Sequence, residues 1–258
     1  MVFINSKLWT KEEINKLKEM AANGLFDEEM AEELGRSKGS IQGKRYNEGI
    51  KLFLIDEDVF GDWTYKNSWV LGFMTADGSY SESKPKEFVV YNTDLELIKN
   101  FRDVFKTRKK IYDIKNETRI GNKPVYRLQI WNEKIINFLK SINACGNKDE
   151  RNPFPIIPDQ YKWSFIKGLF DGDGNIYKGT FSIAGRKELI KFVYYWMCHQ
   201  INKFPNKIYT HSATDITKYF QFCPSDSNKI FELIEENSNE TYDSQKYLRW
   251  KKFYDNSA

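Results

Sequence analysis

The sequence predicts an α+β protein in which a small all-α unit of three helices precedes two pseudo-symmetric αββαββα repeats. The first 50 residues hold three short helical patterns with capping residues at their starts. After residue 66 the order helix, strand, strand, helix, strand, strand, helix occurs twice. The leading helix of each copy carries a glycine at the same spacing before an Asp-Gly pair. We therefore expect a domain at 1–50, a linker at 51–66, and a duplicated domain at 67–258 with repeats 67–150 and 151–258.

The composition is that of a folded protein. Of the 258 residues, 40% are hydrophobic and 16% aromatic against 29% charged, so the chain can bury a substantial core. No apolar run approaches the roughly 18 residues that span a bilayer, and the N-terminus lacks the apolar segment of a signal peptide. We expect an intracellular protein without membrane contact. The three cysteines form no CxxC pair, which favours buried or inert thiols over disulfides or zinc.

The first 50 residues predict a helix-turn-helix. Thr10 and Glu13 form a capping box at the start of the first helix. Asp27 is expected to cap the second helix and Ser37 the third. Gly35 supplies the tight turn between the second and third helices. Short helices joined by a glycine turn are typical of helix-turn-helix modules.

Charge separates the second predicted helix from the third. Five acidic residues crowd the second helix, whereas basic residues and a glutamine crowd the third. The net charge of +4 permits nucleic-acid binding without requiring it. We expect the third helix to face DNA phosphates through Lys38, Gln42, Lys44 and Arg45. The segment also resembles Myb-like modules in its opening Leu-Trp-Thr, and the alternative is a three-helix packing module with a solvated basic face.

The first repeat begins with a helix that ends at Asp77. Strands near 79–83 and 86–92 follow, then a helix that starts after Asp94. Strands near 109–115 and 124–131 precede a last helix capped by Asn132. The second repeat has the same order, with a helix ending at Asp173, strands near 175–179, 180–185, 207–213 and 218–223, and helices between and after them.

The helix after residue 185 has a predicted apolar face made of Leu189, Phe192, Val193, Trp196 and Met197. His199 falls in this helix, where a buried side chain is expected. A duplicated α+β unit implies a pseudo-two-fold axis between its copies.

The two leading helices are predicted to meet at that axis. A glycine inside a helix costs about 1 kcal/mol relative to alanine, so Gly72 and Gly168 at matching positions call for compensation. Close backbone approach of the two helices supplies it. This packing brings Asp77 and Asp173 together at the helix ends, where two carboxylates repel and need a cation.

These helices resemble the paired motifs of the LAGLIDADG homing endonucleases, and the resemblance covers about three quarters of the chain. It implies a site-specific double-strand DNA endonuclease that hydrolyses phosphodiesters with divalent metal. Asp77 and Asp173 would bind the metal, together with the backbone carbonyls of Ala76 and Gly172. Oxygen ligands suit Mg²⁺, and Mn²⁺ or Ca²⁺ can occupy such a site.

The resemblance also implies a catalytic lysine after the third helix of each repeat. Lys148 fits this position in the first repeat. In the second repeat Lys251 is expected, with Arg249 and Lys252 as rivals. A solvated surface charge is the alternative for each of these side chains.

The two motifs are unequal. Thr75 stands where an aspartate is common in the family, whereas the second motif keeps Asp171. This earlier position usually serves the helix end rather than the metal. A calcium-binding loop at 171–182 is disfavoured because Ile176 stands in place of the turn glycine and Ser182 in place of a bidentate glutamate.

In the family, the strands form DNA-binding β-saddles that lie in the major groove. Alternation puts polar side chains on the outward faces of the predicted strands. The residues expected to contact DNA from the strands are Arg127, Gln129, Lys207, Tyr209, His211, Tyr219 and Gln221. Alternation alone would equally describe any half-exposed sheet.

The expected partner is double-stranded DNA with a long, specific target, bound by a monomer that acts in intron mobility. The alternative is a non-cleaving DNA-binding regulator or intron-splicing helper on the same fold. An intein-borne enzyme is disfavoured, because the N-terminus is neither Cys nor Ser and the C-terminus lacks a His-Asn ending.

Overall fold

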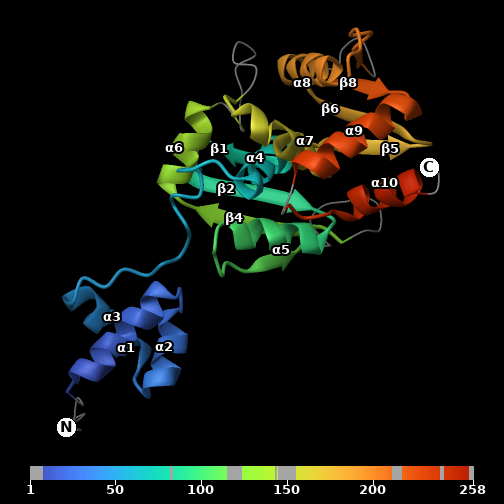
Figure 1. Cartoon of the computed structure of the whole chain (residues 1–258). Coiled ribbons are helices and arrows are strands. Elements are labelled where there is room, and N and C mark those ends of the chain that lie inside the picture. The colour runs from blue at the N-terminus through green and yellow to red at the C-terminus, as the bar shows by residue number, and fades with distance from the viewer. Residues whose placement is uncertain are drawn as a thin grey trace. The chain divides into compact units, whose positions relative to one another are not determined.

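The computed structural model describes residues 8–81, 84–114, 124–142, 144, 155–210, 217–238 and 241–255. The chain divides into two compact units (Figure 1). Unit 1 comprises Met1–Asp56 with Lys106–Arg108, and unit 2 comprises Glu57–Phe105 with Lys109–Ala258. Within the described ranges, every helix is too short or too polar to cross a membrane.

Unit 1 is built from α1 (Lys11–Ala22), α2 (Asp27–Leu34) and α3 (Lys38–Asn47). The Thr10 side chain accepts a hydrogen bond from the Glu13 N–H and completes the expected capping box, and the Ser37 side chain caps α3. Gly35 ends α2 with a φ of 58°, a left-handed conformation that glycine adopts without a Cβ penalty. The buried core of the unit is Leu17, Met20, Ala21, Met30, Ala31 and Ile41.

Asp27 does not cap α2, so that expectation is wrong. Phe26 occupies the cap position, and its N–H donates to the Glu29 carboxylate over 2.8 Å. Asp27 is the first helical residue and is buried. Its Oδ1 accepts from Arg45 Nε over 2.7 Å. Because that partner comes from α3, the local sequence pattern around Asp27 carries no sign of it.

Unit 2 contains the expected duplication. The first repeat consists of α4 (Tyr65–Asp77), β1 (Gly78–Ser81), β2 (Lys84–Asn92), α5 (Leu95–Val104), β3 (Ile111–Asp113), β4 (Tyr126–Trp131) and α6 (Glu133–Ser141). The second consists of α7 (Lys162–Asp173), β5 (Gly174–Tyr177), β6 (Thr180–Arg186), α8 (Lys187–Gln200), β7 (Tyr209–Thr210), β8 (Thr217–Phe222) and α9 (Pro224–Asn237). The antiparallel sheets have the orders β1-β2-β4-β3 and β5-β6-β8-β7, so the second repeat reproduces the first strand for strand.

Two further elements belong to the second repeat. A 3₁₀ turn (Asp159–Tyr161) precedes α7, and a helix α10 (Gln245–Asp255) follows α9. Lys251, Arg249 and Lys252 were singled out in this region as basic residues, but the helix α10 that carries them was not predicted. Tyr247 and Trp250 of α10 are buried, and the Trp250 ring lies 4.9 Å from that of Phe181 in β6. The helix therefore forms part of the core of the second repeat.

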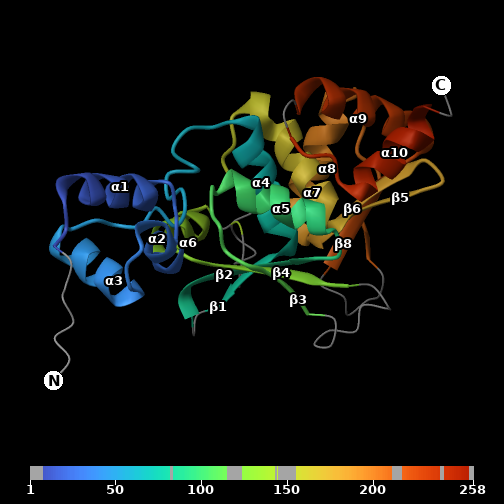
Figure 2. The same cartoon turned by 90° about the horizontal axis from the view of Figure 1, so that it is seen from below.

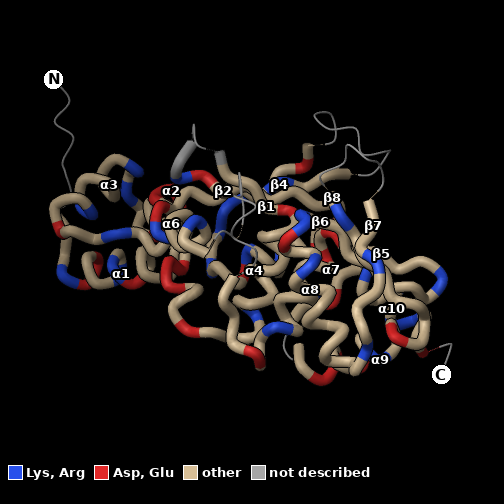
Figure 3. Tube along the Cα trace, turned by 90° about the horizontal axis from the view of Figure 1, so that it is seen from above, with Lys and Arg blue, Asp and Glu red and all other residues tan. Residues whose placement is uncertain are grey.

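Helices cover one face of the first sheet, and the strands run along the other side of unit 2 (Figure 2). Phe101 of α5 packs on Phe73 of α4 and on Phe88 of β2, with ring centroids 5.6 and 6.4 Å apart. The second sheet alternates as expected, since Phe220 and Phe222 are buried and Gln221 is exposed. Lys and Arg are interspersed with Asp and Glu along the chain (Figure 3).

The apolar face of α8 differs from the expected one. Ile190, Val193, Tyr194, Met197 and Cys198 are buried, whereas Phe192 is 37% exposed. The face is turned because the Tyr194 ring stacks on Phe220 of β8 at 5.0 Å.

His199 is exposed, so the expectation of a buried histidine was wrong. Of the cysteines that the structure describes, Cys198 is buried and Cys223 is exposed.

Candidate active site at the paired helices

The two motif helices cross with their backbones in contact at Gly72 and Gly168. A Cβ atom built on Gly72 would lie 2.0 Å from the carbonyl oxygen of Phe165 in α7. One built on Gly168 would lie 2.0 Å from the carbonyl oxygen of Trp69 in α4. Real Cβ atoms do not approach backbone oxygens so closely, so the prediction that these glycines permit close helix approach is confirmed.

The crossing brings together the ends of α4 and α7, where Asp77 and Asp173 are the last helical residues. A Cβ on Gly172 would lie 2.4 Å from Cβ of Ala76 and 3.3 Å from Cγ of Asp77, so the two ends touch. Asp173 is exposed and Asp77 is half-buried. The two acids thus stand at adjoining helix ends, where the Asp77 side chain is half-buried and the Asp173 side chain is exposed.

Burial raises the pKa of Asp77 to about 7, and the nearby charges of Asp173 and Asp171 push it in the same direction. Asn92 Nδ2 donates a hydrogen bond to Asp77 Oδ2 over 2.7 Å and, with Lys246, opposes this rise. Asn92 is the last residue of β2 and was not predicted as a site residue. Its only sequence signal is a polar side chain where the strand gives way to the capped helix α5.

Lys246 of α10 lies at the C-terminal end of α7. Its Nζ donates to the carbonyl oxygens of Gly172 over 2.6 Å and of Phe170 over 3.1 Å. Burial lowers the pKa of Lys246, whereas the charges of Asp171, Asp77 and Asp173 raise it. A cation at the C-terminal carbonyls of α7 is also favoured by the helix dipole.

Lys251, the lysine expected from the sequence, lies five residues further along α10. Its Nζ pairs with Glu235 Oε2 of α9 at 3.0 Å. The rival Arg249 donates to the carbonyl oxygen of Gln245 in its own helix over 3.2 Å. The described contacts bring Lys246, rather than Lys251, to the acids. Lys148 lies outside the described residues.

Asp171 is buried between the two repeats. Its Oδ2 accepts from the Trp69 indole Nε1 of α4 over 2.7 Å, and its Oδ1 accepts from Ser244 Oγ over 2.5 Å. Burial raises the pKa of Asp171 to about 6. At the matching position of the first motif, Thr75 Oγ1 donates to the Leu71 carbonyl within its own helix over 2.7 Å. The hydrogen bonds at this earlier motif position therefore differ, because Asp171 bonds to the other repeat and Thr75 bonds to the Leu71 carbonyl of its own helix.

The donors at the helix ends fit a hard divalent cation. Carboxylate and carbonyl oxygens are the ligands that Mg²⁺ prefers, with water and phosphate filling its other positions. A cation at Asp77 and Asp173 would relieve the repulsion that helps to raise the pKa of Asp77. The Gly172 carbonyl has a second lone pair beside the one that Lys246 uses. In the part of the chain that the structure describes, this site included, His, Cys, Asp and Glu side chains form no cluster of three or more.

The outward face of the first sheet carries a row of Tyr91, Arg127 and Tyr112 on neighbouring strands. The Arg127 guanidinium lies 5.3 Å from the centre of the Tyr112 ring. Gln129 Nε2 donates over 2.7 Å to Glu87, which is buried. The two residues expected to contact DNA from this sheet are thus on the predicted face, and Gln129 already has a protein partner.

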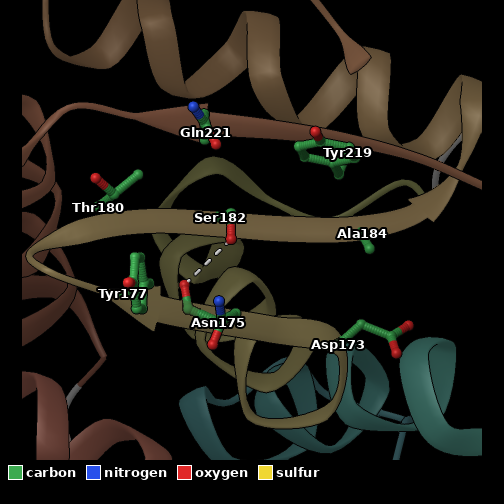
Figure 4. A pocket seen from close by; sticks show the side chains of 8 residues that line it. All are labelled: Asp173, Asn175, Tyr177, Thr180, Ser182, Ala184, Tyr219 and Gln221. Carbon is green, nitrogen blue, oxygen red and sulfur yellow. Dashed lines mark hydrogen bonds between the residues drawn. The ribbon is translucent and has the colours of Figure 1, made fainter. Parts of the chain in front are cut away.

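The second sheet is hollowed next to Asp173 (Figure 4). The groove has a volume of about 430 Å³ and is lined by Asp173, Asn175, Tyr177, Thr180, Ser182, Ala184, Tyr219 and Gln221. All of these side chains except Asp173 are uncharged. Tyr219 stacks on Tyr209 at 5.3 Å, and Lys207 Nζ lies 5.5 Å from the Tyr209 ring. His211 lies outside the described residues.

The residues expected to contact DNA from α3 all have partners inside unit 1. Lys38 pairs with Glu28 at 2.5 Å and Lys44 with Glu48 at 2.6 Å. Arg45 binds both carboxylate oxygens of Asp27, and Gln42 donates to Oδ2 of the same aspartate. Arg45 therefore has an internal role, holding α3 to α2, that sequence reasoning did not identify.

Comparison with known proteins finds similarity for part of the sequence and for the fold. Residues 64–143 match the model of the LAGLIDADG-like domain. Mesophilic variants of the homing endonuclease I-DmoI match with 16% identity over 73% of this chain and 97% of theirs, at a TM-score of 0.51.

Two DNA complexes match at lower scores. I-DmoI in complex with DNA and Ca has 17% identity, covers 66% and 88% of the two chains, and gives a TM-score of 0.47. The I-LtrWI LAGLIDADG homing endonuclease bound to target DNA has 12% identity, covers 74% and 90%, and gives 0.49. Among curated proteins none matches the sequence.

Proposed function

We propose that this chain, which carries a LAGLIDADG-like domain at residues 64–143 and has the fold of the homing endonuclease I-DmoI, is a site-specific double-strand DNA endonuclease. The observation that carries the proposal is the meeting of Asp77 and Asp173 at the contact of α4 and α7. Both acids are present in one chain, so a monomer offers one complete pair.

Asp77 and Asp173, with the carbonyl oxygens of Gly172 and Ala76, would hold a divalent cation such as Mg²⁺, which supplies positive charge to the scissile phosphates. Asn92 fixes the rotamer of Asp77 through its 2.7 Å hydrogen bond. Lys246 would place an ammonium beside the attacking water and the developing negative charge. We propose Lys148 for the corresponding role in the first repeat.

The outward faces of the two sheets would lie in the major groove. An arginine suits guanine and a glutamine suits adenine, so Arg127 and Gln221 are the side chains best suited to contact bases. Tyr219 and Tyr209 would extend this surface in the second repeat, and we also propose Lys207 and His211 as DNA-contacting residues of that repeat. The groove of Figure 4, whose lining has no basic side chain and is uncharged apart from Asp173, supports hydrogen-bonding contact with bases rather than attraction of phosphates alone.

Residues 1–50 would add affinity outside the cut region as a helix-turn-helix, joined by residues 51–66 to the endonuclease domain at 67–258. Lys38 and Gln42 are exposed on α3 and would contact DNA after exchanging their protein partners for phosphate or bases. Lys44 is the weaker candidate because only 18% of its side chain is exposed.

The test is cleavage of a randomised double-stranded DNA library by the pure protein with Mg²⁺. We expect cleavage at a long specific site, and loss of cleavage in Asp77→Asn and in Asp173→Asn. Asp103→Asn is the matched control, because this aspartate is exposed on α5 and pairs only with its neighbour Arg102 among the contacts described.

Indifference of cleavage to both substitutions would sink the proposed site. A wild-type protein that binds a DNA site and never nicks it, with Mg²⁺, Mn²⁺ or Ca²⁺, would instead support the non-cleaving regulator or splicing helper.

A further inference from the structure

The first turn of α10 is held by side chains from both repeats. Ser244 precedes the helix, and its Oγ accepts from the Tyr247 N–H over 3.0 Å, as a capping residue does. Lys246 is the second residue of α10, so its position depends directly on where this turn lies. Two carboxylates, Asp171 and Asp94, contact the turn.

Asp171 ties the turn to α7. The Ser244 hydroxyl donates to Asp171 Oδ1 over 2.5 Å, and both residues are buried. The other Asp171 oxygen accepts from Trp69 of α4 over 2.7 Å. Lys246 then donates to Gly172 O over 2.6 Å, immediately beyond Asp171 in the chain.

Asp94 ties the same turn to the first repeat. Its Oδ1 caps α5 by accepting from Glu96 N at 3.1 Å and Leu97 N at 3.2 Å. Its Oδ2 accepts from the Gln245 N–H over 3.0 Å, so one carboxylate serves the N-termini of two helices from different repeats.

The contact continues from Asp94 to Asp77. The Asp94 N–H donates to Asn92 Oδ1 over 2.8 Å, and Asn92 Nδ2 donates to Asp77 Oδ2 over 2.7 Å. A hydrogen-bonded path therefore runs from the first turn of α10, through Asp94 and Asn92, to the acid of the first repeat. Lys246 and Asp77 are set in position by the two ends of one network.

We propose that Asp94 and Ser244 are positioning residues, which fix the first turn of α10 so that Lys246 stands beside Asp77 and Asp173. The inference rests on the proposed function. Because Asp94 belongs to the first repeat and Lys246 to the second, Lys246 reaches its position only when the two repeats are docked. This dependence would couple the lysine of one repeat to the integrity of the other.

Asp94→Asn separates the two roles of this side chain. An asparagine oxygen still caps α5, but the amide nitrogen cannot accept from Gln245 N–H. We expect the single-turnover cleavage rate at saturating DNA to fall about ten- to hundredfold, as for a catalytic group misplaced by about 1 Å. The dissociation constant for DNA should change less than about threefold.

Ser244→Ala should slow cleavage in the same way, and Ser244→Thr should restore it because threonine keeps a capping hydroxyl. Asn132→Ala is the matched control. It removes the cap of α6, which accepts from Ile135 N over 2.9 Å, without touching α10. Its cleavage rate should stay within about twofold of the wild-type rate.

The decisive variant is Asp94→Asn combined with Lys246→Met. If Asp94 acts through Lys246, the double variant cleaves no more slowly than Lys246→Met alone. If Asp94→Asn slows the Lys246→Met protein as much as it slows the wild type, the residue has only a general structural role and the inference is overturned.

Hydrogen exchange of the metal-free protein gives a readout apart from cleavage. In Asp94→Asn, the Gln245 amide should exchange at least about tenfold faster than in the wild type, whereas Asn132→Ala should leave it unchanged. Unchanged exchange in Asp94→Asn overturns the positioning contact itself. A wild-type protein that cleaves no DNA overturns the proposed function instead.

Discussion

The two repeats of unit 2 share one strand order and differ in how their motif helices connect to the rest of the molecule. In the first, Thr75 bonds within its own helix, and Asp77 is half-buried against Asn92. In the second, Asp171 bonds to α4 and to Ser244, and Asp173 is exposed beside the groove. The backbone frame is thus duplicated, whereas the polar contacts of the matching motif residues differ between the two copies.

This difference shows which positions must be the same in both repeats and which can differ. The glycines at the crossing must match, because each faces a backbone carbonyl of the other helix. The position before each Ala-Asp or Gly-Asp end need not match, because Thr75 and Asp171 form different hydrogen bonds there.

The largest expected effect on stability tests the matching glycines at the helix crossing. Gly72→Ala and Gly168→Ala should each destabilise unit 2 by more than about 4 kcal/mol, because the new methyl meets a backbone oxygen that cannot rotate away. Urea unfolding measures the change. Gly43→Ala in α3 is the control: its Cβ would meet no atom within 4 Å, so stability should stay equal or rise by up to about 1 kcal/mol. Equal effects at Gly43 and Gly72 would contradict the close crossing.

Substitutions at Asp171 and at Thr75, which occupy matching positions in the two motifs, should lower the free energy of unfolding by different amounts. Asp171→Ala leaves the buried donors of Trp69 and Ser244 without an acceptor and should cost about 2 to 4 kcal/mol. Thr75→Ala removes a bond within one helix and should cost about 1 kcal/mol or less. Both are measured by urea unfolding without metal, and equal losses would show that Asp171 does not join the repeats.

The two acids should differ in their effect on the pH dependence of stability. Since burial raises the pKa of Asp77 to about 7, the folded protein keeps a proton that the unfolded chain loses near pH 4. The stability contributed by that protonated form is complete below about pH 4 and is lost as the pH rises through about 7. Between about pH 5.5 and 8.5, metal-free wild type should lose about 1 to 2 kcal/mol more than Asp77→Asn.

Thermal unfolding in EDTA at the two pH values measures this difference. Asp173→Asn should keep most of the wild-type pH dependence, because burial is a larger cause of the Asp77 shift than the charge of Asp173. A wild type and an Asp77→Asn protein with parallel pH profiles would contradict the raised pKa.

The smallest expected effects distinguish the two sheet faces. Arg127→Gln should weaken binding to the cleaved site by about 1 kcal/mol and reduce the salt slope by about 1. Gln221→Ala, from the groove beside Asp173, removes no charge, so it should weaken binding by a similar amount and leave the slope unchanged. A salt titration of DNA affinity measures both, and equal slopes in the two variants would remove the contrast between the sheets.

Local signals in the sequence predicted much of the fold. The caps at Thr10, Ser37 and Asn132 were predicted, and α5 begins after Asp94 as expected, because a capping side chain bonds a backbone N–H two or three residues away. The order of elements was also predicted, since helical and strand periods are local properties. The buried face of α8 was not, because the Tyr194 ring is drawn inward by Phe220 of β8, a remote strand.

The candidate site likewise contains residues that local sequence signals predicted and residues that they did not. Gly72, Gly168 and the two acids follow from their repetition in the sequence, and repetition needs no knowledge of the chain path. Lys246 and Asn92 carry no repeat signal. Lys246 meets Gly172 across 74 residues of sequence and Asn92 meets Asp77 across 15, on elements whose approach depends on the packing of whole helices and sheets.

The sequence by itself determined that this protein has two copies of one unit, where α1, α3, α5 and α6 begin, and which helices meet. Only the tertiary structure decided which lysine joins the acids, and that Arg45 holds unit 1 together. The physical reason is that capping and periodicity act within a few residues, whereas a charge finds its partner by position in space. Residues 246–252 of α10 include four lysines and arginines, and only the packing of this helix determines that Lys246 is the one at the end of α7.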